Sequence, residues 1–269
     1  MTHPQFSRRD FMIASAAIAG AGAQLTSANA TQQPSAVAAS QDASRRGLVS
    51  KRSIRIAHLT DTHIQPEERA GQGVGAAFEH VMGLSDRPEL ILTGGDHIMD
   101  AWAQTADRTK EQFQLWHKVC KDHCTIPMKA CIGNHDMWAI NREKSNVSGQ
   151  EPNLGKQRAI DELGIPHRYY TFTQAGWKFI VLDSVIPTSA DTYDGGLDDE
   201  QFEWLKGELQ QTPAKQPVLV LTHVPIIHAS ALLVADDKKP RQVSRGKFFM
   251  DALRVVDLLQ KFPNVKVVL

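Results

Sequence analysis

The chain has 269 residues, of which 42% are hydrophobic and 22% are charged, as in an ordinary soluble globular protein. Lys and Arg number 30 and Asp and Glu also number 30, so the charge balance indicates neither a nucleic-acid partner nor an anionic membrane surface. The 3 cysteines are too few and too closely spaced for a disulfide framework. None of them lies in a CxxC pair, so a thiolate zinc site is not indicated either.

Residues 1–30 have the order of an export signal. Arg8 and Arg9 precede an apolar, small-residue stretch, and Ala28-Asn29-Ala30 forms an A-x-A exit. The apolar run is too short and too rich in Ala and Gly to anchor the chain in a membrane. The paired arginines resemble the twin-arginine (Tat) signal; a chance Arg-Arg pair ahead of a signal anchor is the alternative. We therefore expect the Tat machinery to export the protein to the periplasm, with cleavage after Ala30.

Replacing Arg8 and Arg9 by lysine is expected to retain the protein in the cytoplasm, because the twin-arginine route requires the arginine pair. Cell fractionation followed by immunoblotting measures this. Unchanged periplasmic delivery would instead indicate general secretion, with folding outside the cell.

Residues 31–52 are rich in Ala, Ser and Gln, which is typical of a flexible linker. From residue 53 to 269 the chain alternates apolar strands with amphipathic helices, which predicts one α/β domain.

The stretch from Ile54 to His63 begins as an apolar strand and ends with Asp61 and His63. Such a strand is expected to be buried on both faces in a parallel sheet. Ligands bind beyond the carboxyl ends of strands in such sheets. Carboxylate oxygen and imidazole nitrogen at this spacing suit a divalent ion such as Mn, Fe or Zn, although a surface turn would use the same residues.

A polar, glycine-rich loop is expected over 65–75, followed by a helix over 76–84. Gly71 to Ala76 has a GxGxxA pattern, but it does not follow its strand directly, so we interpret it as a loop and not as a dinucleotide fingerprint. The later elements are expected in this order: strand 88–95, helix 107–123, strand 127–132, a short helix near Ile160, a hairpin of 169–173 and 177–183, helix 197–209 with a capping box of Asp198 and Gln201, strand 217–222, helix 249–259 and strand 264–269.

Three of these later strands also end in polar residues: Asp96 follows Gly94-Gly95, Asn134-His135-Asp136 follows Gly133, and His223 precedes Val224-Pro225. Each has a simple structural explanation, such as a turn residue or a helix cap. Together they would place carboxylates, a carboxamide and imidazoles at one sheet edge. Such crowding of acids is repulsive without cations between them, so the pattern predicts a metal site.

The ordered motifs D-x-H, G-D, G-N-H-D and H-x-P resemble the calcineurin-like metallophosphoesterase superfamily across residues 54–269. The finer resemblance is to its bacterial cyclic-nucleotide phosphodiesterase branch. The resemblance implies an α/β fold in which a two-sheet β sandwich is flanked by helices, with a dinuclear metal centre at the strand ends.

The resemblance also implies a role for each motif residue. Asp61 and His63 would bind the first metal, Asp96 would bridge both, and Asn134 and His223 would bind the second. His135 would protonate the leaving oxygen, and Asp136 would orient His135.

The implied reaction is hydrolysis of a phosphodiester or phosphomonoester by a hydroxide bound between two divalent ions (Mn, Fe or Zn). Specificity would lie in loops such as 65–75 and 141–157. The aromatic residues Trp102, Trp138 and Tyr193 would stack on a base, cover a lipid headgroup or form an apolar lining.

The sequence departs from the superfamily pattern at two places. Met99 stands where an acid or amide often follows the bridging Asp, which affects an outer contact only. The G-H-x-H motif that would supply one further histidine to each metal is absent, since the sequence stops at Leu269. We therefore expect a C-terminally truncated domain with low metal occupancy and weak activity.

Two other functions are alternatives to the phosphoesterase. A non-catalytic, metal-poor remnant or binding module is the alternative that the missing histidines allow. A thiol-dependent hydrolase using Cys131 has no His–Asn pairing to support it.

Overall fold

A computed structural model describes residues 52–67, 69–228 and 244–269, and Arg52–Leu269 form a compact unit. The signal peptide and, apart from Arg52, the linker expected before this unit lie outside the described residues. Within the described ranges, no helix has both the length and the apolar character needed to cross a bilayer.

The first sheet holds three parallel strands in the order β1 (Ile56–Leu59), β2 (Leu90–Thr93) and β3 (Met128–Ala130). The central strand β2 is fully buried, whereas β1 is an edge strand in the described chain and its His58 is exposed. The expectation that the strand starting at Ile54 is buried on both faces is therefore wrong. Both-face burial belongs to β2.

The second sheet has the order β4 (Tyr170–Gln174), β5 (Trp177–Val181), β8 (Val218–Leu221) and β9 (Val265–Val268). β4 and β5 form the expected antiparallel hairpin, and β8 and β9 extend the sheet in parallel. The short strands β6 (Val185–Pro187) and β7 (Tyr193–Gly195) pair separately.

The two sheets share one apolar core. Leu90 and Leu92 of β2 belong to the same buried cluster as Val218 and Val220 of β8, and alternate residues of β2 point the other way toward the helices, as strand geometry requires. The Tyr170 hydroxyl also donates to the Ala130 carbonyl oxygen at 2.9 Å, which links the sheets directly. This arrangement confirms the predicted sandwich.

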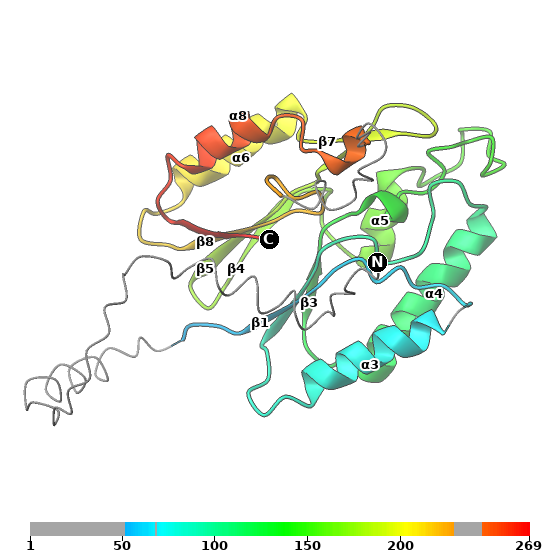
Figure 1. Cartoon of the computed structure of the whole chain (residues 1–269), viewed down its shortest axis with the longest axis horizontal. Coiled ribbons are helices and arrows are strands. Elements are labelled where there is room, and N and C mark those ends of the chain that lie inside the picture. The colour runs from blue at the N-terminus through cyan, green and yellow to red at the C-terminus, as the bar shows by residue number, and fades with distance from the viewer. Residues whose placement is uncertain (1–51, 68, 229–243) are drawn as a thin grey trace, which may run out of the picture. The chain divides into compact units, whose positions relative to one another are not determined.

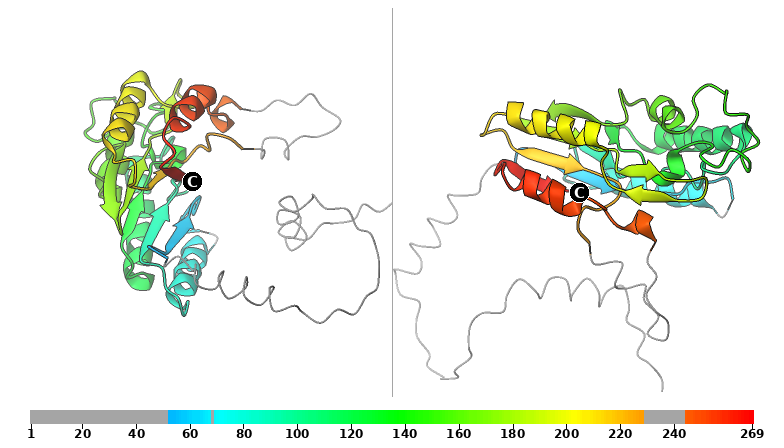
Figure 2. Two further views of the ribbon diagram at one scale, coloured as in Figure 1. Left: turned by 90° about the vertical axis from the view of Figure 1, so that its left-hand side faces the viewer. Right: turned by 90° about the horizontal axis from the view of Figure 1, so that it is seen from above.

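The helices lie outside the strands, which confirms the α/β prediction (Figures 1 and 2). α3 (Ala70–Met82) pairs with α4 (Ala106–His123) beside the first sheet, and both contribute to a cluster that includes Ile91 of β2. Buried residues of α6 (Asp199–Gln211) and α8 (Ala252–Leu259) belong to the core that includes β5 and β8. Among the residues that the structure describes, the remaining helical elements are α5 (Lys156–Leu163) and the single 3-10 turns η1 (Asn134–Asp136) and η2 (Arg245–Lys247).

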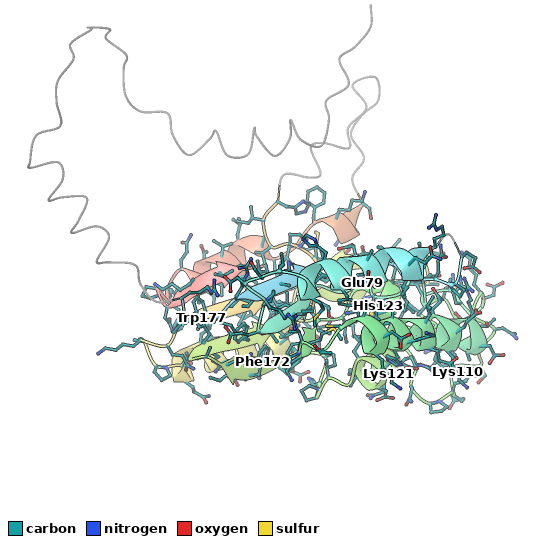
Figure 3. The ribbon with its side chains drawn as sticks, turned by 90° about the horizontal axis from the view of Figure 1, so that it is seen from below. Glu79, Lys110, Lys121, His123, Phe172 and Trp177 are labelled. Carbon is teal, nitrogen blue, oxygen red and sulfur yellow. The ribbon has the colours of Figure 1, made fainter. Side chains whose placement is uncertain are left out.

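α3 begins at Ala70, so the interpretation of Gly71 to Ala76 as a loop is wrong. Gly75 permits close packing of α3 on α4, since a Cβ there would lie 3.1 Å from the His123 ring. His123 Nδ1 also lies 2.9 Å from the Glu79 carboxylate across the same helix pair (Figure 3). Packing thus outweighs the low helix propensity of glycine.

α6 begins with half of the predicted capping box. The Asp198 side chain accepts a hydrogen bond from the Gln201 N–H at 2.8 Å, as expected of an N-cap. The Gln201 side chain does not return to Asp198. Instead it pairs twice with the backbone of Asp183, through Asp183 N–H at 2.8 Å and Asp183 C=O at 2.8 Å, and so joins α6 to the end of β5.

Candidate metal centre

The carboxyl ends of strands from both sheets meet in one cleft of about 430 Å³. The loop after β1 is held to the loop after β2 by hydrogen bonds from Asp61 N–H to Gly95 O (3.1 Å) and from His63 N–H to Asp96 O (3.0 Å). His223 Nδ1, after β8, lies 2.8 Å from Gly94 O and so joins the second sheet to the first. All five residues expected to bind metal line this cleft: Asp61, His63, Asp96, Asn134 and His223.

Asp96 lies between two pairs of these side chains. One of its oxygens is 3.5 Å from His63 Nε2, which in turn is 3.8 Å from a carboxylate oxygen of Asp61. The other oxygen is 3.4 Å from His223 Nε2, which is 3.1 Å from the Asn134 carbonyl oxygen. Asp96 therefore lies between an Asp61–His63 side and an Asn134–His223 side; that these two sides bind two metal ions stays a prediction.

The backbone is strained at these positions. Asp61, His63 and Asp96 have φ of 54°, 43° and 54°, in the left-handed region that non-glycine residues seldom adopt. Such strain is kept where it serves a function. Gly133 permits the close approach of the two ligand loops, since a Cβ there would lie 2.2 Å from the backbone nitrogen of Asp96.

The two carboxyl groups of the site differ in how well the protein compensates their charge. Burial raises the pKa of Asp96, the nearby Asp136 charge raises it further, and His223 opposes the shift. The half-exposed Asp61 behaves differently, since the adjacent His63 imidazole lowers the pKa of its carboxyl to about 2. A buried carboxylate whose ionised form is disfavoured is stabilised by a bound cation.

The residues present fit divalent metal ions. The donor atoms are carboxylate oxygens, imidazole nitrogens and one carboxamide oxygen, a mixed set that suits Mn, Fe or Zn. Asp61, Asp96 and His223 bring ligand atoms within 4.8 Å of one another, as do His63, Asp96 and His135. His63 Nδ1 is buried without a hydrogen-bond partner among the described residues, and Nε2 is the ring nitrogen that faces Asp61 and Asp96.

His135 lies at the edge of the cleft and is oriented by a backbone group. Its Nδ1–H donates to the Met99 carbonyl oxygen, which leaves Nε2 available to a substrate. Its ring meets the His63 ring edge-on, with centroids 4.7 Å apart. The same position brings His135 close enough to His63 and Asp96 to act as a ligand, so geometry alone allows both roles.

Asp136 does not contact His135 in the described hydrogen-bond network, in contrast to the expected role. Its fully buried carboxylate accepts from the backbone N–H groups of Gly133 (2.9 Å), Asp96 (3.0 Å) and His97 (2.8 Å), and from His97 Nδ1–H (2.9 Å). Burial opposes its ionisation, but His97 and the backbone donors prevail and lower the pKa of Asp136. Asp136 therefore holds the Asp96 loop against the Asn134 loop. The sequence feature that could have indicated the His97–Asp136 hydrogen bond is the position of His97 directly after Asp96.

Tyr193 on β7 enters the site in a way that sequence reasoning missed. Its hydroxyl lies 3.0 Å from the Asn134 carbonyl oxygen, and burial raises the pKa of the phenol to about 12, so it is protonated and donates. Trp102 packs beside it, with ring centroids 5.8 Å apart. Trp138 is buried, and its Nε1–H is bonded to Gln104 O, so it is not available to stack on a substrate. The sequence suggested stacking, a headgroup cover or an apolar lining for these three residues, but not the hydrogen bond from Tyr193 to Asn134.

Cys131 is fully buried, and burial raises the pKa of its thiol well above the ordinary value. A neutral, inaccessible thiol is not a nucleophile, which argues against a thiol-dependent hydrolase.

Parallel strands that gather carboxylates, imidazoles and a carboxamide at their carboxyl ends define an α/β protein with a candidate metal centre of the hydrolytic type. The family model described as calcineurin-like phosphoesterase matches residues 54–269, and the chain belongs to this family of hydrolases.

The individual proteins to which the chain is similar share only about a quarter of their aligned residues with it. A 3',5'-cyclic adenosine monophosphate phosphodiesterase (CpdA) of Vibrio vulnificus is 25% identical, covering 81% of this chain and 69% of the relative. A probable glycerophosphodiester phosphodiesterase (GpdQ) of Arcobacter nitrofigilis is 25% identical, with coverages of 78% and 68%. Among solved structures, a phosphopantetheinyl hydrolase of Mycobacterium tuberculosis aligns with a TM-score of 0.36 at 15% identity, covering 64% of this chain and 69% of that one.

Proposed function

We propose that this protein is a metal-dependent phosphoesterase that hydrolyses a phosphodiester or phosphomonoester with two divalent ions, of Mn, Fe or Zn. The observation that carries the proposal is the position of Asp96, whose two oxygens face two separate pairs of ligand side chains. Membership of the phosphoesterase family supports the reaction class.

Asp61 and His63 would hold one ion, and Asn134 and His223 would hold the other. Asp96 would contact both ions. Two ions bound here would supply an activated water and the positive charge that offsets charge developing on the phosphoryl oxygens. Asn134 is a neutral ligand, so it adds no repulsion against an anionic substrate. The partly buried carboxylates and imidazoles are held in place by the hydrogen bonds between the strand-end loops, so little reorganisation is needed on binding.

His135 would transfer the proton to the leaving oxygen. Its Nδ1–H is committed to Met99 O, so Nε2 is the atom that faces the substrate. Histidine is the side chain that most often serves this role at neutral pH.

Phosphodiesters are the first substrate class to test, because the relatives named above are a cyclic-nucleotide phosphodiesterase and a probable glycerophosphodiester phosphodiesterase. The cleft is open and lined by the ligand side chains together with Tyr193, Pro225 and Lys247, which leaves room for either ester.

The test measures hydrolysis of bis(p-nitrophenyl) phosphate and of p-nitrophenyl phosphate in the presence of Mn, Fe or Zn. The wild-type protein is compared with the His223→Ala and His80→Ala variants. We expect metal-dependent turnover that His223→Ala lowers more than about 100-fold, beyond the loss typical of an outer-shell partner. His80 is exposed on α3 and serves as the matched control. Hydrolysis that survives chelation, or none with any metal, would contradict the proposal.

A further inference from the structure

The Asn134 side chain can bind a cation through only one of its two ends. Its carbonyl oxygen is an acceptor with two lone pairs, whereas its NH2 group only donates. Rotation of the amide by half a turn would present NH2 to the cation and abolish the ligand. A group that distinguishes the two ends therefore determines whether Asn134 can serve.

Tyr193 is such a group. Its hydroxyl donates to the Asn134 carbonyl oxygen at 3.0 Å, which occupies one lone pair and leaves the second for a cation. His223 Nε2 lies 3.1 Å from the same oxygen, so this oxygen faces the Asn134–His223 side of the site.

The Tyr193 ring is itself held firmly. Gly246 lies directly against it, since a Cβ on Gly246 would be 2.6 Å from the ring, and Trp102 packs on it from another side. Arg245 forms a bidentate ion pair with Asp194, with N···O distances of 2.7 and 2.6 Å, which connects η2 to β7 beside the ring. The hydroxyl therefore has a defined position in the cleft wall.

We infer that Tyr193 is a positioning residue that selects the metal-binding orientation of the Asn134 amide, and so sets the affinity of one of the two ion positions. The inference rests on the proposed function. It assigns to Tyr193 a hydrogen bond to a ligand in place of the stacking that its aromatic ring suggested.

Tyr193→Phe removes the hydroxyl and keeps the ring. In calorimetric titrations of metal-free protein with Mn or Zn, we expect the variant to weaken one of two binding events by about 10–100-fold, the range for outer-shell partners of ligands. The other event should be unchanged, since Tyr193 contacts no ligand on the Asp61–His63 side in the described structure. Tyr169→Phe is the matched control, because it removes a hydroxyl that bonds Glu200 at 2.9 Å, away from the cleft.

A second variant separates amide selection from a merely structural role. In an Asn134→Asp background both ends of the side chain are oxygens, so no selection is needed. Tyr193→Phe should then change metal affinity by less than about 3-fold, and the two substitutions should be strongly non-additive. Thermal unfolding of all variants checks the fold.

Three results would overturn the inference. They are an equal loss of metal affinity in the Asn134 and Asn134→Asp backgrounds, an equal weakening of both binding events, and no change in either binding event. If the wild-type protein binds two ions and hydrolyses phosphoesters, and Tyr193→Phe has the same metal affinities, only the role of Tyr193 is refuted. Wild-type protein that takes up no metal would refute the proposed function together with this inference.

Discussion

Asp96→Asn is expected to abolish binding of both metal ions and, with it, phosphoester hydrolysis. Asp96 is the residue whose two carboxylate oxygens face both His63 and His223, at 3.5 and 3.4 Å. Asparagine offers one oxygen and no charge, so it cannot join two cations. The loss should follow from ligation and not from unfolding, because burial already disfavours the ionised form of Asp96.

Metal content by mass spectrometry, turnover of the diester substrate and thermal unfolding of the metal-free protein measure the three parts of this prediction. Asp86→Asn is the control, since Asp86 is an exposed partner of Arg52 and Arg55 far from the cleft. An Asp96→Asn protein that still bound two ions would show that Asp96 is not shared between them.

His135→Ala is expected to keep the metal ions and lower turnover by roughly 10²–10⁴-fold, the range for a general acid. The loss should be largest for esters with poor leaving groups, such as alkyl phosphodiesters. It should be smallest for p-nitrophenyl esters, whose leaving oxygen needs little protonation.

The contrast with His63→Ala makes the result decisive. His63→Ala should empty one ion position, whereas His135→Ala should leave metal content unchanged. His135 lies close enough to His63 and Asp96 to bind an ion. Loss of metal from His135→Ala, with equal effects on all leaving groups, would identify His135 as a ligand and not as the acid.

The order of the strands and the meeting of their polar ends were predictable from sequence. β1, β2 and β3 are short apolar strands that are each followed by a polar motif, and parallel strands of one sheet place those ends at one edge. His223 was expected at the same edge, but it follows β8 of the second sheet, so its place in the site depends on how the two sheets pack. The division into an Asp61–His63 pair and an Asn134–His223 pair comes from the family resemblance, and the structure places Asp96 between the two pairs. Metal binding by these residues stays a prediction.

Other features depend on contacts that no local pattern records. α3 starts at Ala70 and includes Gly75, which packs closely against α4, a property of the helix pair and not of the segment. Asp136 accepts a hydrogen bond from His97 and not from His135, because the loops after β2 and β3 lie in close contact at Gly133. Tyr193 reaches Asn134 from a hairpin far along the chain, at a distance of 59 residues in sequence.

The most direct test of the dinuclear site is a titration of metal-free protein with Mn, Fe or Zn in which bound metal and hydrolysis of bis(p-nitrophenyl) phosphate are followed together. Turnover should be absent without metal, rise as the ions bind, and reach its maximum when two equivalents are bound per chain. Turnover by the metal-free protein, or metal bound to saturation without turnover of any phosphoester, would contradict the account.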